Sequence, residues 1–264
     1  MNYRLTRVYT LEEIQEVVFQ MSPLKAPRPD GYSAGFFQDN WPIVGEEVCQ
    51  AIFTSLNSGI LNTYLNFTYI VFIPIKQNAS VVSDFRPISL YNILYKIISK
   101  VLANRLKEIL TEIIFATQSA FILGRLIADN ILATYETLHM MHSRMYGKKG
   151  YMAVKLDMNK AYDRVEWQFL EVVMVAMGFV EEWVKLIMMC VHTANYSVFV
   201  NGNPVGEIWP TRGIRQGDPI SPYLFLLWAK ALSSQLSWAD EMGELTGVLT
   251  SKFGPCLNHL FFCK

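Results

Sequence analysis

Charged residues are scarce in this sequence. They make up 17% of the 264 residues, whereas an average soluble domain has about 25%. Hydrophobic residues make up 52%. A disordered chain needs the opposite balance, low hydrophobicity with high charge, so that class is excluded. The 23 basic residues are matched by 23 acidic ones, so the chain also lacks the net positive charge of a free basic nucleic-acid-binding module.

Long hydrophobic runs are absent as well. The longest uncharged stretch, residues 48–75, is interrupted by Asn, Gln, Ser and Thr, whereas a spanning helix needs about 20 mainly apolar residues. We therefore expect no membrane association. The N-terminus has no apolar segment typical of a secretory signal, and we expect an intracellular protein, nuclear or cytoplasmic. No C-x-x-C pair or metal-ligand spacing occurs, so we interpret the cysteines as reduced packing residues: Cys49, Cys190, Cys256 and Cys263.

Zero net charge conceals an uneven distribution. Residues 1–75 carry a net charge of −3, residues 76–150 a net charge of +5, and residues 151–264 a net charge of −2. The middle of the chain is therefore a candidate surface for a polyanion. The alternative is that this basic segment only faces acidic neighbours.

Hydrophobic periodicity and turn residues predict a mixed α+β fold without regular βαβ alternation. A capping box at Thr10 and Glu13 predicts the start of the first helix. We expect a polar loop around the sequence DFRPIS and a turn at 147–150. We predict helices at about 11–21, 35–58, 90–110, 126–145, 166–177, 181–191 and 221–241. We predict strands at about 67–75, 151–156, 197–200, 205–209 and 257–262.

The segment AVKLDMNKAYDRVEW, residues 153–167, is a candidate for chemistry. Its predicted strand ends at Asp157, where a strand would fix the carboxylate while the following loop keeps it accessible to a metal ion. By itself the pattern is weak, because the spacing between Asp157 and Asp163 is common. The alternatives are that Asp157 caps the following turn and that Tyr162 is a packing residue.

The segment TRGIRQGDPISPYLFLL, residues 211–227, is the second candidate. Its glycines allow close approach of another backbone or a substrate, and the N-terminus of its predicted helix favours anionic groups. The alternative is a loop in which Asp218 or Ser221 caps a helix whose apolar residues belong to the core.

Together, LDMNKAYDRVEW and RQGDPISPYLF resemble the reverse transcriptases of LINE-type (non-LTR) retrotransposons, and most closely those of plant genomes. KAPRPDG, DFRPISLYNILYKIISKVLANRL and QSAFILGRLIADN precede them in the family's order. The resemblance implies a right-hand polymerase fold with fingers and a partial palm. Residues 1–150 would form an N-terminal extension and fingers, residues 151–264 would form the palm, and the thumb would be absent.

The resemblance also implies roles for individual residues. Asp157 would be the first catalytic aspartate and a ligand of both Mg²⁺ ions. Tyr162 would pack under the incoming sugar and reject a 2′-hydroxyl, which favours a DNA product. Gln216 and Gly217 would lie beside the nascent base pair, and Arg86 would lie near the triphosphate. The implied partners are an RNA template, a DNA primer and a deoxynucleoside triphosphate.

Three cations in the predicted helix at 90–110 would be less specific nucleic-acid contacts. They are Lys96, Lys100 and Arg105. This interpretation would place the basic middle of the chain in the fingers, where polyanions are expected. The alternative is an ordinary solvated helix face.

The sequence departs from the family near its C-terminus. Cys263 and Lys264 follow HLFF, where the family continues with Ala and two adjacent aspartates. One carboxylate cannot hold two divalent ions about 4 Å apart, so we expect this chain alone to be catalytically incomplete. Arg28 also stands at a position where the family usually has Gly, and Leu123 at one where it usually has Pro.

Three interpretations remain at this stage. The chain is a truncated, inactive reverse transcriptase domain; or its end is an artefact of a gene model or of cloning and the whole protein polymerises; or it is a domesticated, non-catalytic RNA-binding module on the same fold. A truncated palm would leave apolar residues exposed, which predicts aggregation or dye binding.

Overall fold

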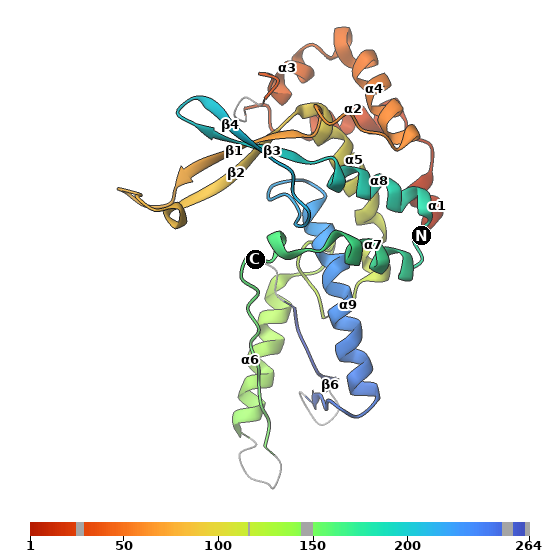
Figure 1. The fold of residues 1–264 in the computed structure, drawn as a ribbon. Coiled ribbons are helices and arrows are strands. Elements are labelled where there is room, and N and C mark those ends of the chain that lie inside the picture. Colours follow the sequence, from red (N-terminus) through yellow and green to blue (C-terminus); the bar gives the residue numbers. More distant parts are fainter. Residues whose placement is uncertain (25–28, 116, 144–149, 250–255, 262–264) are drawn as a thin grey trace.

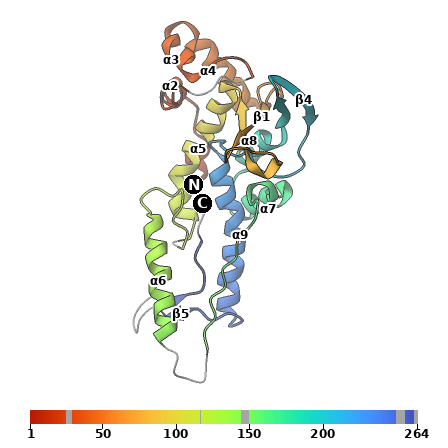
Figure 2. The ribbon, with the colours of Figure 1, turned by 90° about the vertical axis from the view of Figure 1, so that its left-hand side faces the viewer.

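The computed structural model describes residues 1–24, 29–115, 117–143, 150–249 and 256–261. Within these residues the chain is a mixture of helices and short strands, as predicted. Figure 2 shows an elongated molecule. The sheet and the helices within residues 11–58 lie at one end, and helix α6 (Ile127–Ser143) and most of α9 (Ser221–Glu241) extend toward the other. No helix in this part of the chain is long and apolar enough to span a membrane.

The elements follow one another as shown in Figure 1. The helices are α1 (Asn2–Thr6), α2 (Leu11–Phe19), α3 (Ala34–Asp39), α4 (Trp41–Ser58), α5 (Ile93–Ile113), α6 (Ile127–Ser143), α7 (Trp167–Ala176), α8 (Glu181–His192) and α9 (Ser221–Glu241). The strands are β1 (Phe67–Pro74), β2 (Phe85–Tyr91), β3 (Asn195–Val200), β4 (Asn203–Ile208), β5 (Val248–Leu249) and β6 (Cys256–Leu257).

The main sheet has the strand order β2-β1-β3-β4. Strand β1 pairs antiparallel with β2 and parallel with β3, and β3 forms the predicted hairpin with β4. The prediction of a polar loop around DFRPIS is wrong, because residues 85–91 form strand β2. Pro87 is tolerated there because β2 is an edge strand, where a missing N–H breaks no inner ladder.

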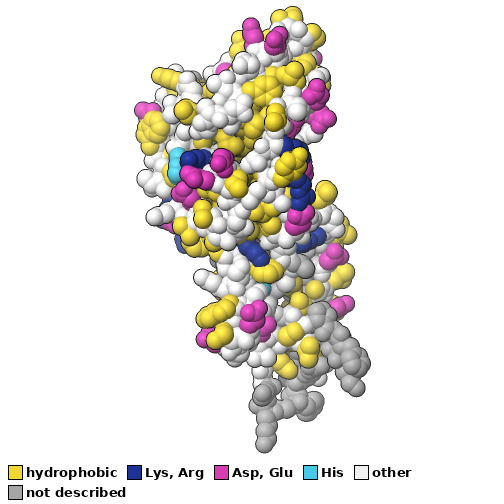
Figure 3. All heavy atoms as spheres, turned by 90° about the vertical axis from the view of Figure 1, so that its right-hand side faces the viewer, with side chains coloured by type: hydrophobic (Ala, Val, Ile, Leu, Met, Phe, Trp, Pro, Cys, Tyr) yellow, Lys and Arg dark blue, Asp and Glu magenta, His cyan; other side chains and the backbone are white. Residues whose placement is uncertain are grey.

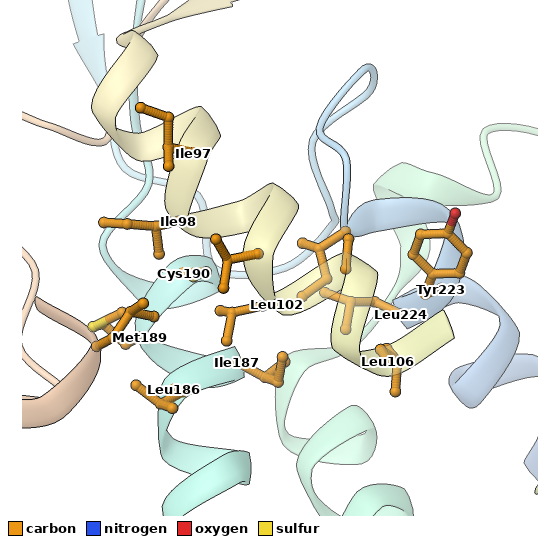
Figure 4. Close-up of a cluster of buried hydrophobic side chains, with 14 of the residues drawn as sticks. Ile97, Ile98, Leu102, Leu106, Leu186, Ile187, Met189, Cys190, Tyr223 and Leu224 are labelled. Atoms are coloured by element: carbon orange, nitrogen blue, oxygen red, sulfur yellow. The ribbon is translucent and has the colours of Figure 1, made fainter. Parts of the chain in front are cut away.

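Helix α5 runs through the centre of the hydrophobic core. Its apolar stripe is buried because it meets side chains of α8 and α9, as Figure 4 shows. The core residues from these three helices include Ile97, Ile98, Leu102, Leu106, Leu186, Ile187 and Leu224. The long amphipathic helix predicted from the sequence therefore exists, and it begins at Ile93 rather than at residue 90.

Local signals explain several helix ends. The Thr10 side chain accepts a hydrogen bond from the Glu13 N–H at 3.2 Å, which confirms the predicted N-cap of α2. The single helix predicted at 35–58 is divided at Asn40 into α3 and α4. Pro42 in the first turn of α4 has no N–H to continue the preceding helix, so a new helix starts there.

The strand predicted at 151–156 is wrong. These residues are exposed and pair with no other strand in the described structure; Val154 is 65% and Leu156 is 81% exposed. An apolar run alone does not make a strand, because the backbone N–H and C=O groups must also pair with a neighbouring strand. The final strand is shorter than predicted: β6 ends at Leu257, and Phe261 then forms an isolated bridge with Gln118.

Several predictions lie outside the described residues: the Gly-to-Arg change at Arg28, the turn at 147–149, and the replacement of the family's Ala and Asp by Cys263 and Lys264. Leu123 is described and is 83% exposed, so the loop accepts this residue without burying it.

Figure 3 shows basic and acidic side chains close together on one face rather than a patch of one sign. Two ion pairs join α1 and its C-cap to α5: Arg4 with Glu112 at 2.5 Å and Arg7 with Glu108 at 2.8 Å. The uneven charges of the sequence segments are thus partly balanced against each other by the fold.

Candidate active site

The two segments that the sequence indicates as candidates for chemistry, residues 153–167 and 211–227, lie against each other, although about 50 residues separate them. The Gly213 N–H donates to the Val165 carbonyl at 2.7 Å, and the Ile214 N–H donates to the Tyr162 carbonyl at 2.9 Å. The Trp167 indole N–H closes the junction by donating to the Gly213 carbonyl at 2.6 Å. These three bonds fix the segment that follows Asp157 to the loop that carries Gln216.

Gly213 is needed for this close approach. Its φ is +88°, and a Cβ at this position would lie 3.2 Å from the Asp163 Cα and 3.3 Å from the Asp163 carbonyl oxygen. Any other residue would therefore meet a strained backbone conformation and a neighbouring backbone at once. The expectation that a glycine of this segment allows close approach holds for Gly213.

Gln216 and Gly217 form the exposed tip of a tight turn. The Asp218 N–H donates to the Arg215 carbonyl at 3.4 Å, which closes a four-residue turn. Gly217 occupies its third position with φ at +85°, the conformation that a type II turn requires there. The tip presents Gln216 to solvent, while the two flanking residues, Arg215 and Asp218, point inward.

Arg215 is 5% exposed and is enclosed by three tyrosine rings. Its Cζ lies 4.8, 4.7 and 5.5 Å from the ring centroids of Tyr91, Tyr95 and Tyr196. Its Nη2 donates to the Asn66 Oδ1 at 2.7 Å and to the Asn66 carbonyl at 3.2 Å. Burial alone would lower the pKa of the guanidinium, but the tyrosines and Asp218 outweigh it and leave this pKa raised, so Arg215 stays charged.

Asp218 is 4% exposed and receives its partners from helix α5. The Tyr95 hydroxyl donates to Oδ2 at 2.5 Å, and the Ser99 hydroxyl donates to Oδ1. The Arg215 Nη1 lies 3.6 Å from Oδ2, an ion pair longer than a hydrogen bond. Burial, and then the charge of Asp218, raise the pKa of Tyr95 well above its usual value, so this phenol remains a donor.

The alternative that Asp218 or Ser221 caps the helix is wrong, because Ile220 is the N-cap of α9 and no side chain caps it. The Asp218 Oδ1 accepts a hydrogen bond from the Ile220 N–H at 3.3 Å, just before the helix. The carboxylate therefore ties the turn to the residue from which α9 starts.

Asp157 precedes this junction in the sequence, whereas Tyr162 belongs to it through its carbonyl. Asp157 is exposed, in the segment that the structure leaves outside any sheet. Tyr162 is half-buried, with its ring centroid 5.4 Å from that of Phe225, so it packs against α9 as the packing alternative expected. The role that the resemblance implies for Tyr162 stays a prediction.

The donor set for Mg²⁺ is incomplete in the described part of the chain. No group of three or more His, Cys, Asp or Glu residues is placed there to hold a metal ion. Asp157 is a hard oxygen ligand of the kind that Mg²⁺ prefers, but one carboxylate does not make a two-metal site. The residues described here do not by themselves fit the expected pair of ions.

Arg86 lies apart from the turn. It is exposed on β2, in register with Ile73 of β1. Because successive residues of a strand alternate between faces, Arg86 lies on the face opposite to Tyr91. The Tyr91 hydroxyl donates to the Gly217 carbonyl at 2.9 Å, so the structure brings Tyr91, and not Arg86, to the tip.

The three cations of α5 that are predicted to contact nucleic acid are less exposed than a solvated helix face would be. Lys96 is 9% exposed, and Arg105 is fully buried. Lys100 is half-buried, and its Nζ donates to the Gln20 carbonyl at 3.3 Å. Residues at the N-terminus of the chain cover this face of the helix, which the sequence pattern of α5 alone did not reveal.

Arg105 uses all five of its N–H donors inside the protein. Its Nη atoms donate to the carbonyls of Leu5, Arg7 and Val8 at 2.9, 2.6 and 3.1 Å. Nε and Nη2 also donate to the Glu13 carboxylate at 2.8 and 2.7 Å. A guanidinium saturated in this way has no donor left for a phosphate, so the prediction that Arg105 contacts nucleic acid is wrong.

Tyr95, Ser99 and Arg215 were missed in the sequence analysis. Tyr95 and Ser99 are polar residues four positions apart on the apolar side of α5, which places them on one face of the helix. This spacing inside a hydrophobic stripe was the available signal. The sequence could not show that their common partner lies more than 100 residues away.

Comparison with known proteins agrees with the motifs. The family described as "Reverse transcriptase (RNA-dependent DNA polymerase)" matches residues 75–243. The chain is 30% identical over 224 residues to the Xenopus laevis "Transposon TX1 uncharacterized 149 kDa protein", covering 85% of this chain and 17% of that protein. It is 29% identical over 253 residues to the Drosophila melanogaster "Retrovirus-related Pol polyprotein from type-2 retrotransposable element R2DM", covering 94% of this chain and 22% of that protein.

A shorter match is closer in sequence. Over 68 residues, the chain is 48% identical to the Arabidopsis thaliana "Uncharacterized mitochondrial protein AtMg01250", a match that covers 25% of this chain and 56% of that protein.

The chain spans about a fifth of the length of the TX1 and R2DM proteins. The family match covers most of the chain and includes both segments of the site. The chain belongs to the reverse transcriptase family, in its LINE-type (non-LTR) branch.

Proposed function

We propose that this chain serves RNA-directed DNA synthesis by a non-LTR retroelement. In this proposal it binds an RNA template, a DNA primer and a deoxynucleoside triphosphate. Residues 1–150 act as N-terminal extension and fingers, and residues 151–264 as palm. The observation that carries the proposal is the junction of the Tyr162 segment with the turn that presents Gln216. This junction supports a single site in which Tyr162 contacts the sugar of the nucleotide and the neighbouring Gln216 contacts the base pair.

Individual roles follow the same proposal. Asp157 would be a magnesium ligand, Tyr162 would exclude a 2′-hydroxyl, and Gln216 with Gly217 would contact the nascent base pair. Arg86 would reach the triphosphate from β2. In this proposal Asp157 would help to hold Mg²⁺, whose charge would offset the negative charge that develops during nucleotidyl transfer.

The incomplete donor set makes polymerisation by these residues alone unexpected. Asp157 is exposed and has no metal-binding cluster around it in the described structure. We therefore expect template and nucleotide binding without primer extension from the purified chain. Extension that is abolished by Asp157→Ala would contradict this expectation of catalytic incompleteness, although it would support the proposed reaction itself.

The decisive test is template-directed nucleotide binding. The purified chain is loaded with an RNA template annealed to a DNA primer, in Mg²⁺, and the lifetime of the complex is measured with each of the four deoxynucleotides. We expect the nucleotide complementary to the next template base to lengthen that lifetime. We also expect Tyr162→Ala to let the matching ribonucleotide do the same.

Two results would oppose the proposal. A chain that binds RNA in a salt-dependent way but treats all four nucleotides alike would instead be an RNA-binding module on this fold. A chain that binds neither template nor nucleotide at low salt would exclude both functions.

A further inference from the structure

The buried pair of Arg215 and Asp218 lies directly under the exposed Gln216–Gly217 tip. These four residues are consecutive, and the turn bond between Arg215 and Asp218 closes them into one unit. The tip makes the proposed contact with base pair and template, whereas its two flanking residues are 5% and 4% exposed. The orientation of the tip is therefore decided by what holds the flanking residues inside the protein.

Helix α5 supplies most of that hold. The Tyr95 hydroxyl bonds to one oxygen of Asp218, and the Ser99 hydroxyl bonds to the other. Ser99 also accepts a hydrogen bond from the Ile220 N–H at 3.3 Å, so it supports the chain on the far side of the turn as well. Bonds to a carboxylate are roughly twice as strong as neutral ones, and here they lie away from water.

The space beside the pair argues against a ligand pocket. The cavity lined by Tyr95, Cys190, Tyr196, Arg215 and Asp218 has a volume of about 20 Å³. Small-molecule sites have volumes of roughly 300–1,000 Å³, so this space admits a water molecule at most. The polar groups around this space therefore bind one another instead of a ligand, and by doing so they hold the turn.

We propose that Tyr95 and Ser99 are positioning residues, which act through Asp218 and Arg215 to hold the Gln216–Gly217 turn in the orientation that meets nucleotide and template. The inference rests on the function proposed above. It links the helix that carries the hydrophobic core to the tip of the site. It also predicts that one buried hydroxyl, distant from solvent, changes how the exposed tip behaves.

Limited proteolysis with trypsin tests this proposal without any measurement of polymerase activity. The Arg215 side chain is 3% exposed, whereas the Arg212 side chain in the same loop is 61% exposed. Cleavage after Arg215 requires the turn to open, and its rate follows the population of the open form. The ratio of cleavage after Arg215 to cleavage after Arg212 therefore reports opening at Arg215, and urea unfolding of each variant shows whether global stability has changed as well.

Two matched variants, Tyr95→Phe and Tyr9→Phe, each remove one buried tyrosine hydroxyl. Tyr95→Phe removes the bond to Asp218, and we expect the cleavage ratio to rise roughly tenfold. Ser99→Ala should raise it as well. Tyr9→Phe is the control, because the Tyr9 hydroxyl is buried, has no hydrogen-bond partner among the described residues and lies in the segment between α1 and α2. We expect this control to stay within about twofold of the wild type. A ratio for Tyr95→Phe no higher than that of Tyr9→Phe would overturn the inference.

Nucleotide binding distinguishes positioning from general support. With template and primer bound, Tyr95→Phe should weaken binding of the complementary deoxynucleotide several-fold and leave template–primer affinity unchanged. Equal weakening of both would indicate general destabilisation and would overturn the positioning role. If the wild type itself binds no nucleotide, the proposed function fails, and the cleavage ratio still decides whether α5 holds the turn.

Discussion

Arg105 of α5 meets Glu13 of α2 with two parallel hydrogen bonds, Nε to Oε1 at 2.8 Å and Nη2 to Oε2 at 2.7 Å. The Arg105 Cζ also lies 3.6 Å from the ring centroid of Tyr9. This geometry fastens the N-terminal 20 residues to the central helix of the core. A cation that the sequence suggests for nucleic acid is therefore a structural anchor.

The first prediction concerns this anchor. Arg105→Ala removes five hydrogen bonds and leaves the Glu13 carboxylate without its buried partner, so we expect a loss of about 3–5 kcal/mol in the free energy of unfolding. Arg105→Lys should also lose stability, because an ammonium group cannot reproduce the planar fork. Urea unfolding measures both.

Lys107→Ala is the control for the anchor, because Lys107 is exposed on the same helix. Its expected loss is within about 1 kcal/mol. If Arg105→Ala lost no more stability than this control, the network would not be an anchor.

The second prediction compares two glycines with nearly equal backbone angles. Gly213 and Gly217 have φ at +88° and +85°, but an added Cβ meets the Asp163 backbone at Gly213 and open space at Gly217. Gly217→Ala should cost about 1–2 kcal/mol, the price of the left-handed conformation alone. Gly213→Ala should destabilise further, because the Asp163 backbone must also move. Urea unfolding of both variants checks the order, and equal losses would contradict the close packing at Gly213.

The third prediction concerns stability at high pH. Burial raises the pKa of Tyr9 to about 12, whereas in the unfolded chain this phenol titrates near its ordinary value of 10. Between these values the unfolded state releases the proton and the folded state keeps it, so stability falls as the pH rises. At pH 11 this group alone should lower the free energy of unfolding by about 1 kcal/mol relative to pH 8.

Tyr9→Phe removes that contribution. We expect the variant to be as stable as the wild type or more stable at pH 8, where the lost hydroxyl had no partner among the described residues. It should then lose less stability than the wild type on going to pH 11, as measured by urea unfolding at both values. Parallel losses in the two proteins would show that Tyr9 does not titrate in this way.

The fourth prediction concerns the apolar surface of α6. Ile131 and Leu132 are 56% and 59% exposed, and Tyr135 is 68% exposed. Such a cluster favours dye binding or self-association. Replacing Ile131 and Leu132 with Lys should lower fluorescence of a hydrophobic dye and reduce sedimenting aggregate, with a change in unfolding free energy within about 0.5 kcal/mol. A large loss of stability would show that these side chains are packed.

Much of the secondary structure follows from local signals in the sequence. The Thr10 cap, the apolar period of α5, the proline-started helix α9 and the β3–β4 hairpin were predictable because each depends on residues a few positions apart. The order of the motifs also identified the family. The fingers, the palm and the roles of Asp157, Tyr162, Arg86, Gln216 and Gly217 stay predictions, since no observation on this chain tests them.

Tertiary structure alone decided which polar residues are buried and which strands form. Residues 85–91 form a strand because β1 provides backbone hydrogen-bond partners for them, whereas residues 151–156 have no such partner in the described chain. Arg105 and Arg215 have the same side chain as the exposed Arg86. They differ from it in being buried, because their partners Glu13 and Asn66 come from segments 92 and 149 residues away. The sequence by itself determined the local elements and the family, because short-range propensities and ordered motifs are written along the chain. Burial and pairing are properties of contacts between distant segments, so only the folded structure could decide them.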